Sequence, residues 1–342
     1  MSKAKLTGLP TVDDSPIWRV WLSAFHAPCM VIADELGIFR ELRDEGATAA
    51  ELAQRVSIEL RAMETILALL RSLELLVHAD GRFHLAEVSR HCLLPESPYY
   101  WGGFLKRIRD TPTDVRVLLG SLRSGTAAAD GRVARHWEAA SPPPEFLRDF
   151  THAMHAHSFA LAMRAVPSFG LTDASSVLDA GGGSGSFSIA AAAHYPGLRC
   201  TVLDFPAVCE VADQYIEAAG VADRVSTTAG NLFVGPWPEG HDRILFADIF
   251  HDWDDERCSV MARLAFDALP SGGRVLLHEM LLSDGKDGPL AAAAFSMAMV
   301  FAAQGRQRTA RELAGLLEAA GFVDVRVTPT SGGFALLEAR RT

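Results

Sequence analysis

Residues 177–185 read Val177-Leu178-Asp179-Ala180-Gly181-Gly182-Gly183-Ser184-Gly185, and they decide the fold of the chain. An apolar strand runs into a series of glycines, and an alanine-rich stretch of helical composition follows at 188–194. Glycine lets a ligand approach the backbone closely, and the start of a helix presents unpaired N–H groups. A strand, a glycine loop and a helix in this order predict a ligand-binding turn in an α/β fold.

Other short apolar runs place this turn in a larger sheet. Runs typical of buried strands occur at 201–203, 243–246 and 274–277, with helical stretches between them. This alternation predicts a parallel sheet flanked by helices. Near the C-terminal end, 323–328 and 334–339 flank Ser331-Gly332-Gly333, which predicts a hairpin at the edge of the sheet.

The first hundred residues have a different, mainly helical pattern. Apolar positions recur at helical spacing over 17–42, and Thr48 and Glu51 have the spacing of a capping box. A second apolar face follows over 60–76, and Asp80-Gly81 predicts the tight turn of a small hairpin. This order is the outline of a winged helix. Because the helix at 60–76 mixes acidic and basic residues, unlike a DNA recognition helix, we expect a packing or dimerisation module.

Composition excludes several classes of protein. The 342 residues are 49% apolar and 22% charged, which is typical of globular chains. The length favours two domains, or one large α/β unit with an appendage. We find no apolar run long enough for a membrane helix, and residues 1–16 do not resemble a secretory signal. Five scattered cysteines predict reduced thiols, and a net charge of −10 argues against a nucleic acid partner. We therefore expect a cytoplasmic enzyme.

Two acidic residues indicate what the glycine loop binds. The strand at 201–203 ends in Asp204, which is placed to accept hydrogen bonds from the two hydroxyls of a ribose. A dinucleotide fingerprint would require its third glycine where Ser186 stands. Asp179, just before the first glycine, suits a ligand that carries a cation better than a pyrophosphate. These details favour S-adenosylmethionine, a nucleoside that bears an ammonium group.

Several motifs, in the same order, resemble those of a known family. The chain is similar to the class I S-adenosylmethionine-dependent small-molecule O-methyltransferases of plants and bacteria, which have an N-terminal winged-helix dimerisation domain. The motifs that carry the resemblance are Asp179-x-Gly181-x-Gly183-x-Gly185, residues 35–39, Phe150-x-x-x-Met154-x-x-x-Ser158, Gly230-Asn231-Leu232-Phe233, His251-Asp252-Trp253-x-Asp255-Glu256, Pro270-x-Gly272-Gly273 and Arg308-Thr309.

The resemblance implies a domain division, a cofactor and partners. It implies a helical winged-helix dimerisation domain at 1–115, a helical linker that lines the pocket at 116–165, and an α/β, Rossmann-like methyltransferase domain at 166–342. It implies a homodimer that uses S-adenosyl-L-methionine, releases S-adenosyl-L-homocysteine and acts on a small-molecule acceptor, without a metal, a nucleic acid or a membrane.

The resemblance also implies roles for individual residues. The family usually has aspartate where this chain has Asn231, but an amide oxygen can still accept a hydrogen bond from the adenine amino group. The residues implied in cofactor binding are Asp179, Gly181, Gly183, Gly185, Asp204, Phe205, Asn231, Leu232, Trp253 and Ser158. The residues implied in substrate binding are Met154, Asp252, Met299 and Gln307.

His251 is the candidate catalytic residue. It follows an apolar strand and precedes a helix that starts near Asp254, so it lies at the carboxyl end of a strand, where open α/β sheets bind their ligands. An imidazole with a pKa of about 6.5 can take a proton from a hydroxyl, which predicts a rate that rises through an apparent pKa of about 6–7. The resemblance implies that His251 is the general base and that Glu279 orients it. Where the family often has a second glutamate, this chain has Gln307, which stabilises an imidazolium less.

The acceptor remains open. We expect a hydroxyl of an aromatic or secondary metabolite. A thioether such as 4-methylthio-2-hydroxybutyrate is the alternative, because it has no proton to lose, and Arg306 or Arg308 would then bind its carboxylate. A winged-helix transcription regulator and a non-catalytic cofactor-binding scaffold are further alternatives.

Two clusters of polar residues do not predict a site. The histidines at 152, 155 and 157 do not share one helix face, so we expect no metal there. The acids at 252–256 fit the start of a helix, where they offset the helix dipole, so we expect no catalytic carboxylate pair.

Overall fold

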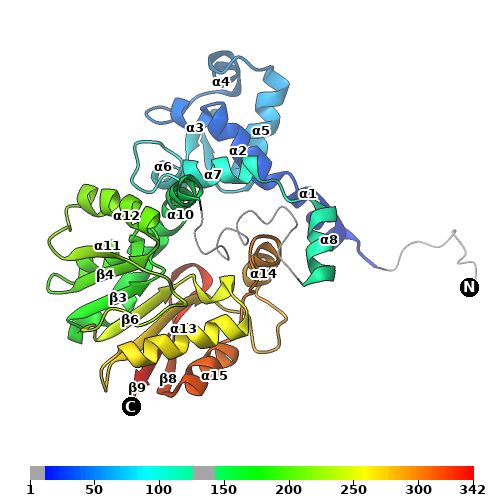
Figure 1. The fold of residues 1–342 in the computed structure, drawn as a ribbon. Coiled ribbons are helices and arrows are strands. Elements are labelled where there is room, and N and C mark those ends of the chain that lie inside the picture. Colours follow the sequence, from blue (N-terminus) through cyan, green and yellow to red (C-terminus); the bar gives the residue numbers. More distant parts are fainter. Residues whose placement is uncertain (1–11, 126–142) are drawn as a thin grey trace, which may run out of the picture. The chain divides into compact units, whose positions relative to one another are not determined.

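The computed structural model describes residues 12–125 and 143–342, and the chain folds into two compact units, Met1–Thr111 and Pro112–Thr342 (Figure 1). The division falls shortly before the predicted boundary at residue 115. The segment 116–165, predicted as a linker, is part of the second unit, where its long helix packs on two helices of the sheet domain. Residues 126–142 of that segment lie outside the described residues.

The first unit is mainly helical, with one small hairpin. The predicted helical stretch 17–42 is divided into three helices, and Gly37, with a φ of 75°, separates the second from the third. The helix predicted over 60–76 ends at Ser72, because Glu74 takes a φ of 61° and the chain enters a strand. The elements are α1 (Ser15–Ser23), α2 (His26–Glu35), α3 (Ile38–Glu41), α4 (Ala49–Arg55), α5 (Leu60–Ser72), β1 (Leu76–Ala79), β2 (Arg82–Leu85), α6 (Glu87–Cys92) and α7 (Gly102–Asp110).

Two local predictions in this unit are confirmed. The Thr48 hydroxyl accepts the Glu51 N–H at 3.2 Å, and the Glu51 carboxylate accepts the Thr48 N–H at 2.8 Å, which makes a complete capping box at the start of α4. Strands β1 and β2 pair antiparallel, and Asp80 and Gly81 join them with φ values of 50° and 73°. Positive φ at both positions is the geometry of a tight hairpin turn.

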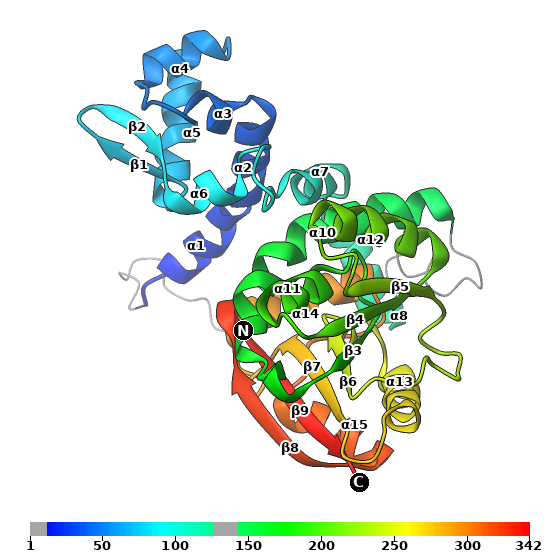
Figure 2. The same ribbon diagram turned by 90° about the vertical axis from the view of Figure 1, so that its left-hand side faces the viewer.

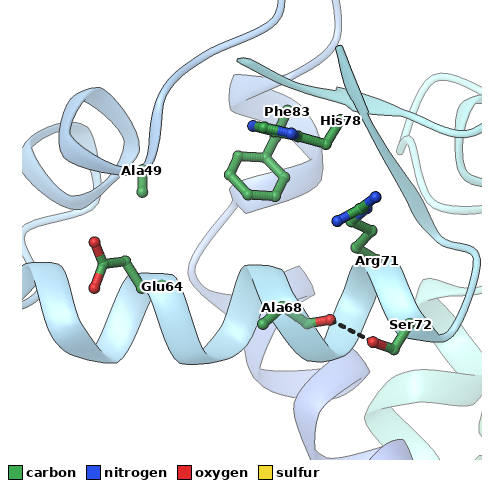
Figure 3. Close-up of a pocket in the computed structure, with 7 residues that line it drawn as sticks. All are labelled: Ala49, Glu64, Ala68, Arg71, Ser72, His78 and Phe83. Carbon is green, nitrogen blue, oxygen red and sulfur yellow. Dashed lines mark hydrogen bonds between the residues drawn. The ribbon is translucent and has the colours of Figure 1, made fainter. Parts of the chain in front are cut away.

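A shallow hollow lies on the surface of the first unit (Figure 3). It has a volume of about 550 Å³ and lies between α5, the start of α4 and the side chains of His78 and Phe83 from the hairpin. Glu64 and Arg71 of α5 bring opposite charges to its rim, and both are exposed. None of the predicted site residues lines it.

The second unit is built on a seven-stranded sheet. Its strand order is β5-β4-β3-β6-β7-β9-β8 (Figure 2), with β5 to β7 parallel and β9 antiparallel to both of its neighbours. The predicted C-terminal hairpin at the sheet edge is confirmed. The strands are β3 (Ser176–Ala180), β4 (Arg199–Asp204), β5 (Val225–Ala229), β6 (Arg243–Ala247), β7 (Arg274–Met280), β8 (Phe322–Pro329) and β9 (Phe334–Arg341).

Helices cover both faces of this sheet (Figure 1). One core cluster joins the sheet to α10, α11 and α12, and the other joins it to α13 and α15. The helices are α8 (Val115–Ser124), α10 (Pro144–Ala165), α11 (Ser186–His194), α12 (Pro206–Ala218), α13 (Asp255–Ala268), α14 (Leu290–Ala302) and α15 (Ala310–Ala320), with short 3-10 turns such as η3 (Phe250–Asp252). No helix in the described ranges, 12–125 and 143–342, has the length and apolar character needed to cross a membrane.

The strand order indicates one end of the sheet as the candidate ligand site. From β3 the chain adds β4 and β5 on one side and then places β6 and β7 on the other side, so the strand order reverses between β3 and β6. Open α/β sheets bind ligands at such a reversal, beyond the carboxyl ends of the strands. Asp204 ends β4, and Asp179 and Glu279 lie near the ends of β3 and β7. His251 follows β6 in the η3 turn.

Candidate functional site

The glycine loop after β3 has the backbone geometry that its sequence predicts. Gly181, Gly183 and Gly185 have φ values of 74°, 57° and 75°, a region that favours glycine. The Gly181 N–H donates to the Leu203 carbonyl at 2.8 Å, which ties the start of the loop to β4. A Cβ atom added at Gly183 would meet no described atom within 4 Å, so the middle of the loop borders open space.

Asp204 holds this loop in place. Its carboxylate accepts the Gly183 N–H at 3.0 Å and the Phe205 N–H at 2.7 Å. Burial raises the pKa of Asp204 to about 6, even though both backbone hydrogen bonds favour the ionised form. A donor from a ligand would therefore meet a carboxylate that is already oriented and partly desolvated.

Asp179 is a second buried carboxylate under the loop. The Ser188 hydroxyl of α11 donates to its Oδ2 atom at 2.8 Å, but Oδ1 has no hydrogen-bond partner among the described residues. Burial, together with the neighbouring charge of Asp204, raises the pKa of Asp179 to about 6. An unpaired acceptor of this kind favours a ligand with a donor or a cation.

Leu232, one of the residues predicted to flank an adenine, lies against the start of the glycine loop. Leu232 and Ile249 are the side chains that a Cβ atom at Gly181 would touch. Asn231 accepts the Phe233 N–H at 2.8 Å through its side-chain oxygen, so this oxygen serves a local turn. The Phe233 ring packs edge-on against Trp253 with centroids 4.7 Å apart. The structure thus brings the glycine loop, Leu232 and the Phe233–Trp253 pair to one end of the sheet.

His251 is fixed by the turn that follows β6. Phe250 is fully buried beside it and anchors η3 in the core. Glu279 accepts the N–H groups of Ile249 and Phe250 through Oε1, at 3.1 and 2.8 Å. Its other oxygen, Oε2, lies 2.7 Å from His251 Nδ1. One carboxylate therefore positions both the turn and the imidazole.

Three carboxylates surround the His251 imidazole. Glu279 and Asp248 lie 2.7 and 3.8 Å from Nδ1, and Asp252 lies 3.6 Å from Nε2. Burial alone would lower the pKa of His251, but these charges outweigh burial and raise the pKa to about 10. Conversely, burial would raise the pKa of Glu279, and the imidazole holds it below its ordinary value. The ligand-type atoms of Asp248, His251 and Glu279 lie within 4.8 Å of one another, a spacing that a metal ion also accepts.

Helices α10 and α14 supply the residues near the imidazole. The Phe295 ring of α14 lies 5.0 Å from His251 and 6.5 Å from His157 of α10, measured between ring centroids. Burial lowers the pKa of His157 to about 4, and His251 contributes to this shift. The Ser158 hydroxyl lies 3.2 Å from His157 Nδ1. Met154 of α10 is half-buried and Met299 of α14 is buried.

The segment after α14 lies against the turn that carries His251. Gly305 N–H donates to the Asp252 carbonyl at 3.0 Å. Gln307 is fully buried, and neither polar atom of its side-chain amide has a hydrogen-bond partner within the described part of the chain. Arg308 is buried and donates to the carbonyls of Phe250 and Trp253 at 2.6 and 2.7 Å, and Arg306 pairs with Glu312.

Two features of the site escaped prediction from the sequence. The Asp248 carboxylate faces His251 at 3.8 Å, but in the sequence it is only one residue of the run that follows the strand. His155 Nδ1 lies 2.9 Å from the hydroxyl of Ser184 in the glycine loop. The His155 ring stacks on the Tyr215 ring, with the ring centroids 3.5 Å apart. The uneven spacing of the three histidines excluded a metal site, but it does not reveal that one of them contacts the loop.

Comparisons with known proteins identify the family. The sequence profile of the O-methyltransferase domain matches residues 125–323, and that of the O-methyltransferase dimerisation domain matches residues 19–95. The chain belongs to the O-methyltransferase family. It is an S-adenosylmethionine-dependent methyltransferase with an N-terminal dimerisation domain, as the sequence motifs implied.

Individual relatives cover most of the chain. A 3-hydroxy-5-methyl-1-naphthoate 3-O-methyltransferase of Streptomyces sahachiroi is 34% identical over 87% of this chain and 86% of the relative. A mitomycin biosynthesis 6-O-methyltransferase of Streptomyces lavendulae is 27% identical over 99% of this chain and 96% of the relative. The crystal structure of human N-acetylserotonin methyltransferase in complex with SAM superimposes with a TM-score of 0.82 at 24% identity, covering 98% of this chain and 99% of that one. The human structure therefore supports the fold.

Proposed function

We propose that this methyltransferase transfers a methyl group to a hydroxyl of an aromatic or secondary metabolite, with His251 as the general base. The observation that carries the proposal is the 2.7 Å contact between Glu279 Oε2 and His251 Nδ1. Because Glu279 is ionised and accepts, Nδ1 carries the proton and Nε2 has a free lone pair in neutral imidazole. A basic nitrogen at the carboxyl edge of the sheet suits the removal of a hydroxyl proton.

The chain's own residues would carry out the proton transfer. Bound S-adenosylmethionine supplies an electrophilic methyl group. His251 accepts the hydroxyl proton at Nε2, and Glu279 holds the imidazole in the tautomer that allows this. Glu279 and Asp252 then stabilise the imidazolium by their charge, since each lies within 4 Å of it. The free enzyme already favours the protonated histidine, so turnover requires a pH high enough to populate the neutral form.

We further propose that the cofactor lies over the glycine loop. Asp204 would hold the ribose hydroxyls, and Leu232 and Trp253 would contact the adenine. Asp179 would offer its unpaired Oδ1 atom to the ammonium end. In this arrangement Asn231 would bind the adenine through its amide while its oxygen keeps the turn to Phe233. Phe205, Ser158 and the glycines complete the predicted set.

Acceptor specificity would come from α10, α14 and the 304–308 segment. Met154 and Met299 would contribute apolar contacts, and Asp252 and Gln307 would contact polar groups of the acceptor. The unpaired amide of Gln307 supports such a role, because buried polar atoms normally have partners.

The contacts of Arg306 and Arg308 argue against a thioether acceptor. It would need a free arginine to bind the carboxylate of the acceptor. Arg308 already donates to two backbone carbonyls and pairs with Asp255 at 2.7 Å, and Arg306 pairs with Glu312. A regulator or a scaffold would not need a buried His251–Glu279 pair.

A screen for labelled methyl transfer tests the proposal. The acceptors to compare are 3-hydroxy-5-methyl-1-naphthoate and N-acetylserotonin, which are named for two similar proteins, and 4-methylthio-2-hydroxybutyrate as the thioether. We expect transfer to a phenol that His251→Ala abolishes. Transfer to the thioether alone, unaffected by His251→Ala, would refute the hydroxyl assignment.

The dimerisation domain supports a homodimer. We propose that two copies associate through this domain and that the protein neither binds nucleic acid nor associates with a membrane. We also propose a cytoplasmic location, which the scattered spacing of the five cysteines in the sequence supports. A gel shift with random duplex DNA tests whether the protein binds nucleic acid, and fractionation of expressing cells tests its location.

A further inference from the structure

Asp248 carries a buried carboxylate with no hydrogen-bond partner among residues 12–125 and 143–342. Its side chain is only 13% exposed, and both oxygens are buried. The backbone is also unusual, because Asp248 has a φ of 57° while its N–H donates to the His278 carbonyl at 3.0 Å. Aspartate and asparagine tolerate this region better than other non-glycine residues. An unpaired buried charge is costly, and such features concentrate at functional sites.

The groups that face Asp248 identify its partner. They are His251 on η3, Asp252 on the same turn and Glu279 on β7. Both acids repel the Asp248 charge, and only the imidazole, 3.8 Å from Oδ1, can become a cation. On the other side of His251, His157 of α10 is neutral, because burial lowers its pKa to about 4. The charge of Asp248 therefore acts on His251.

We propose that Asp248 is a positioning residue for His251, whose carboxylate stabilises the imidazolium formed when His251 accepts the acceptor's proton. The inference rests on the proposed function. It also accounts for the neutral amide of Gln307, because Asp248 adds a negative charge to those of Glu279 and Asp252. At 3.8 Å from Nδ1 it is too distant for a hydrogen bond, so its contribution is electrostatic.

The ionisation of Asp248 fits this role. Burial raises its pKa to about 7, and protonated His251 opposes that rise. The carboxylate is thus most strongly ionised when the imidazole carries its proton, which is the state it stabilises. The two groups titrate as a coupled pair, together with Glu279.

The test is the Asp248→Asn variant, which keeps the size of the side chain and its tolerance for positive φ but removes the charge. The pKa of His251 is measured by NMR titration of its ring protons in the free full-length protein, which needs no acceptor. We expect this pKa to fall by about one unit or more, because an opposite charge at this range shifts a pKa by roughly 1–3 units. Glu256→Gln removes an exposed charge at the start of α13 and should leave the pKa of His251 unchanged.

Kinetics with 3-hydroxy-5-methyl-1-naphthoate provide the second measurement. On the plateau above the histidine step, where the imidazole is neutral, we expect Asp248→Asn to lower kcat by about 3- to 10-fold, because a weaker base removes the proton less readily. The KM for S-adenosylmethionine and the KM for the acceptor should change little. The step in the pH–rate profile should move to lower pH. Asp248→Gly also allows positive φ and serves if the asparagine variant does not fold.

Several results would overturn the inference. An Asp248→Asn protein that folds and leaves the pKa of His251 unchanged would remove its electrostatic role. Loss of wild-type activity on dialysis against EDTA, restored by Zn²⁺, would make Asp248 a metal ligand instead. Full activity of His251→Ala is a separate outcome, because it would refute His251 as the general base. A shift in the pKa of His251 in the Asp248→Asn variant would still support the electrostatic contact between the two residues.

Discussion

At the scale of single residues, the proposed proton transfer depends on which nitrogen of His251 carries the proton. Glu279 settles this by geometry: Oε1 is occupied by two backbone N–H groups, and Oε2 faces Nδ1. The carboxylate cannot turn away without releasing the η3 turn. Nε2 is therefore the nitrogen available to a substrate in the neutral ring.

Glu279→Gln tests this arrangement. Glutamine can still accept the backbone N–H groups through its oxygen, but its NH₂ group would then face Nδ1 and donate to it. The proton would move to Nε2, which could no longer accept one. We expect kcat to fall by roughly 10²–10⁴-fold with a nearly unchanged affinity for S-adenosylmethionine, measured by single-turnover kinetics and calorimetry. A variant with wild-type kcat would show that the tautomer does not matter.

The pH dependence should differ from that of an ordinary histidine. The carboxylates around His251 raise its pKa to about 10, and a base works only in its neutral form. The rate should therefore rise with pH through an apparent pKa above 7, rather than near the value of 6–7 that the sequence predicts. His251→Ala should cost about 10²–10⁴-fold in the chemical step and abolish the rise. A flat profile with an active His251→Asn would instead favour the thioether, which has no proton to lose.

The sequence predicts which residues gather at the site better than it predicts their charge state. His251 follows β6 and Glu279 lies near the end of β7, its parallel neighbour, and the carboxyl ends of neighbouring strands meet at one edge. Asp248 also follows a strand, but nothing local in the sequence shows that its φ is positive or that both oxygens are buried. Charge state depends on burial and on distant neighbours, so it requires the fold.

At the scale of elements, the glycine loop works as a unit with β4. Asp204 is both the predicted ribose ligand and the acceptor of the Gly183 N–H. Removing its carboxylate thus affects the ligand contact and the shape of the loop together.

Two variants test the loop as the cofactor site. Asp204→Ala should weaken S-adenosylmethionine binding by about 1.5–3 kcal/mol, the scale of a hydrogen bond to a charged group. Gly183→Val should abolish binding, because it places a branched side chain in the open space over the loop and strains a positive φ. Gly197→Ala is the control and should bind normally, because a Cβ there also meets open space but Gly197 lies beyond the other end of α11 from the loop. Normal calorimetric binding by both loop variants would mean that the cofactor lies elsewhere.

Elements with clear local signals were predictable, and those that depend on their neighbours were not. The Thr48 capping box and the Asp80-Gly81 turn are local, and both are confirmed. Strand β5 has the sequence Val225-Ser226-Thr227-Thr228-Ala229, which does not predict a strand. It is a largely exposed edge strand, so it lacks the apolar run of a buried strand. The break of the 17–42 stretch at Gly37 depends on one residue with positive φ inside an otherwise helical pattern.

At the scale of the whole molecule, helix α1 indicates how copies associate. It contains Ile17, Trp18, Val20 and Trp21, and none of its residues is buried within the chain. Ile17 and Val20 are 72% and 75% exposed. An apolar helix that the described residues leave exposed, at the start of the matched dimerisation domain, fits an interface with a second copy.

We therefore expect a mass in solution near twice 36.9 kDa by light scattering at micromolar concentration. Val20→Glu should shift the protein toward the monomer, since Ile17, Val20 and Trp21 share one helix face and a charge among them is costly to bury. Arg19→Glu is the matched control: it changes the charge of the same helix on the opposite face and should leave the dimer intact. Because the site residues all belong to the second unit, the Val20→Glu monomer should still bind S-adenosylmethionine. A monomeric wild-type protein, or a Val20→Glu variant that stays dimeric at the same concentration, would exclude α1 as the dimer interface.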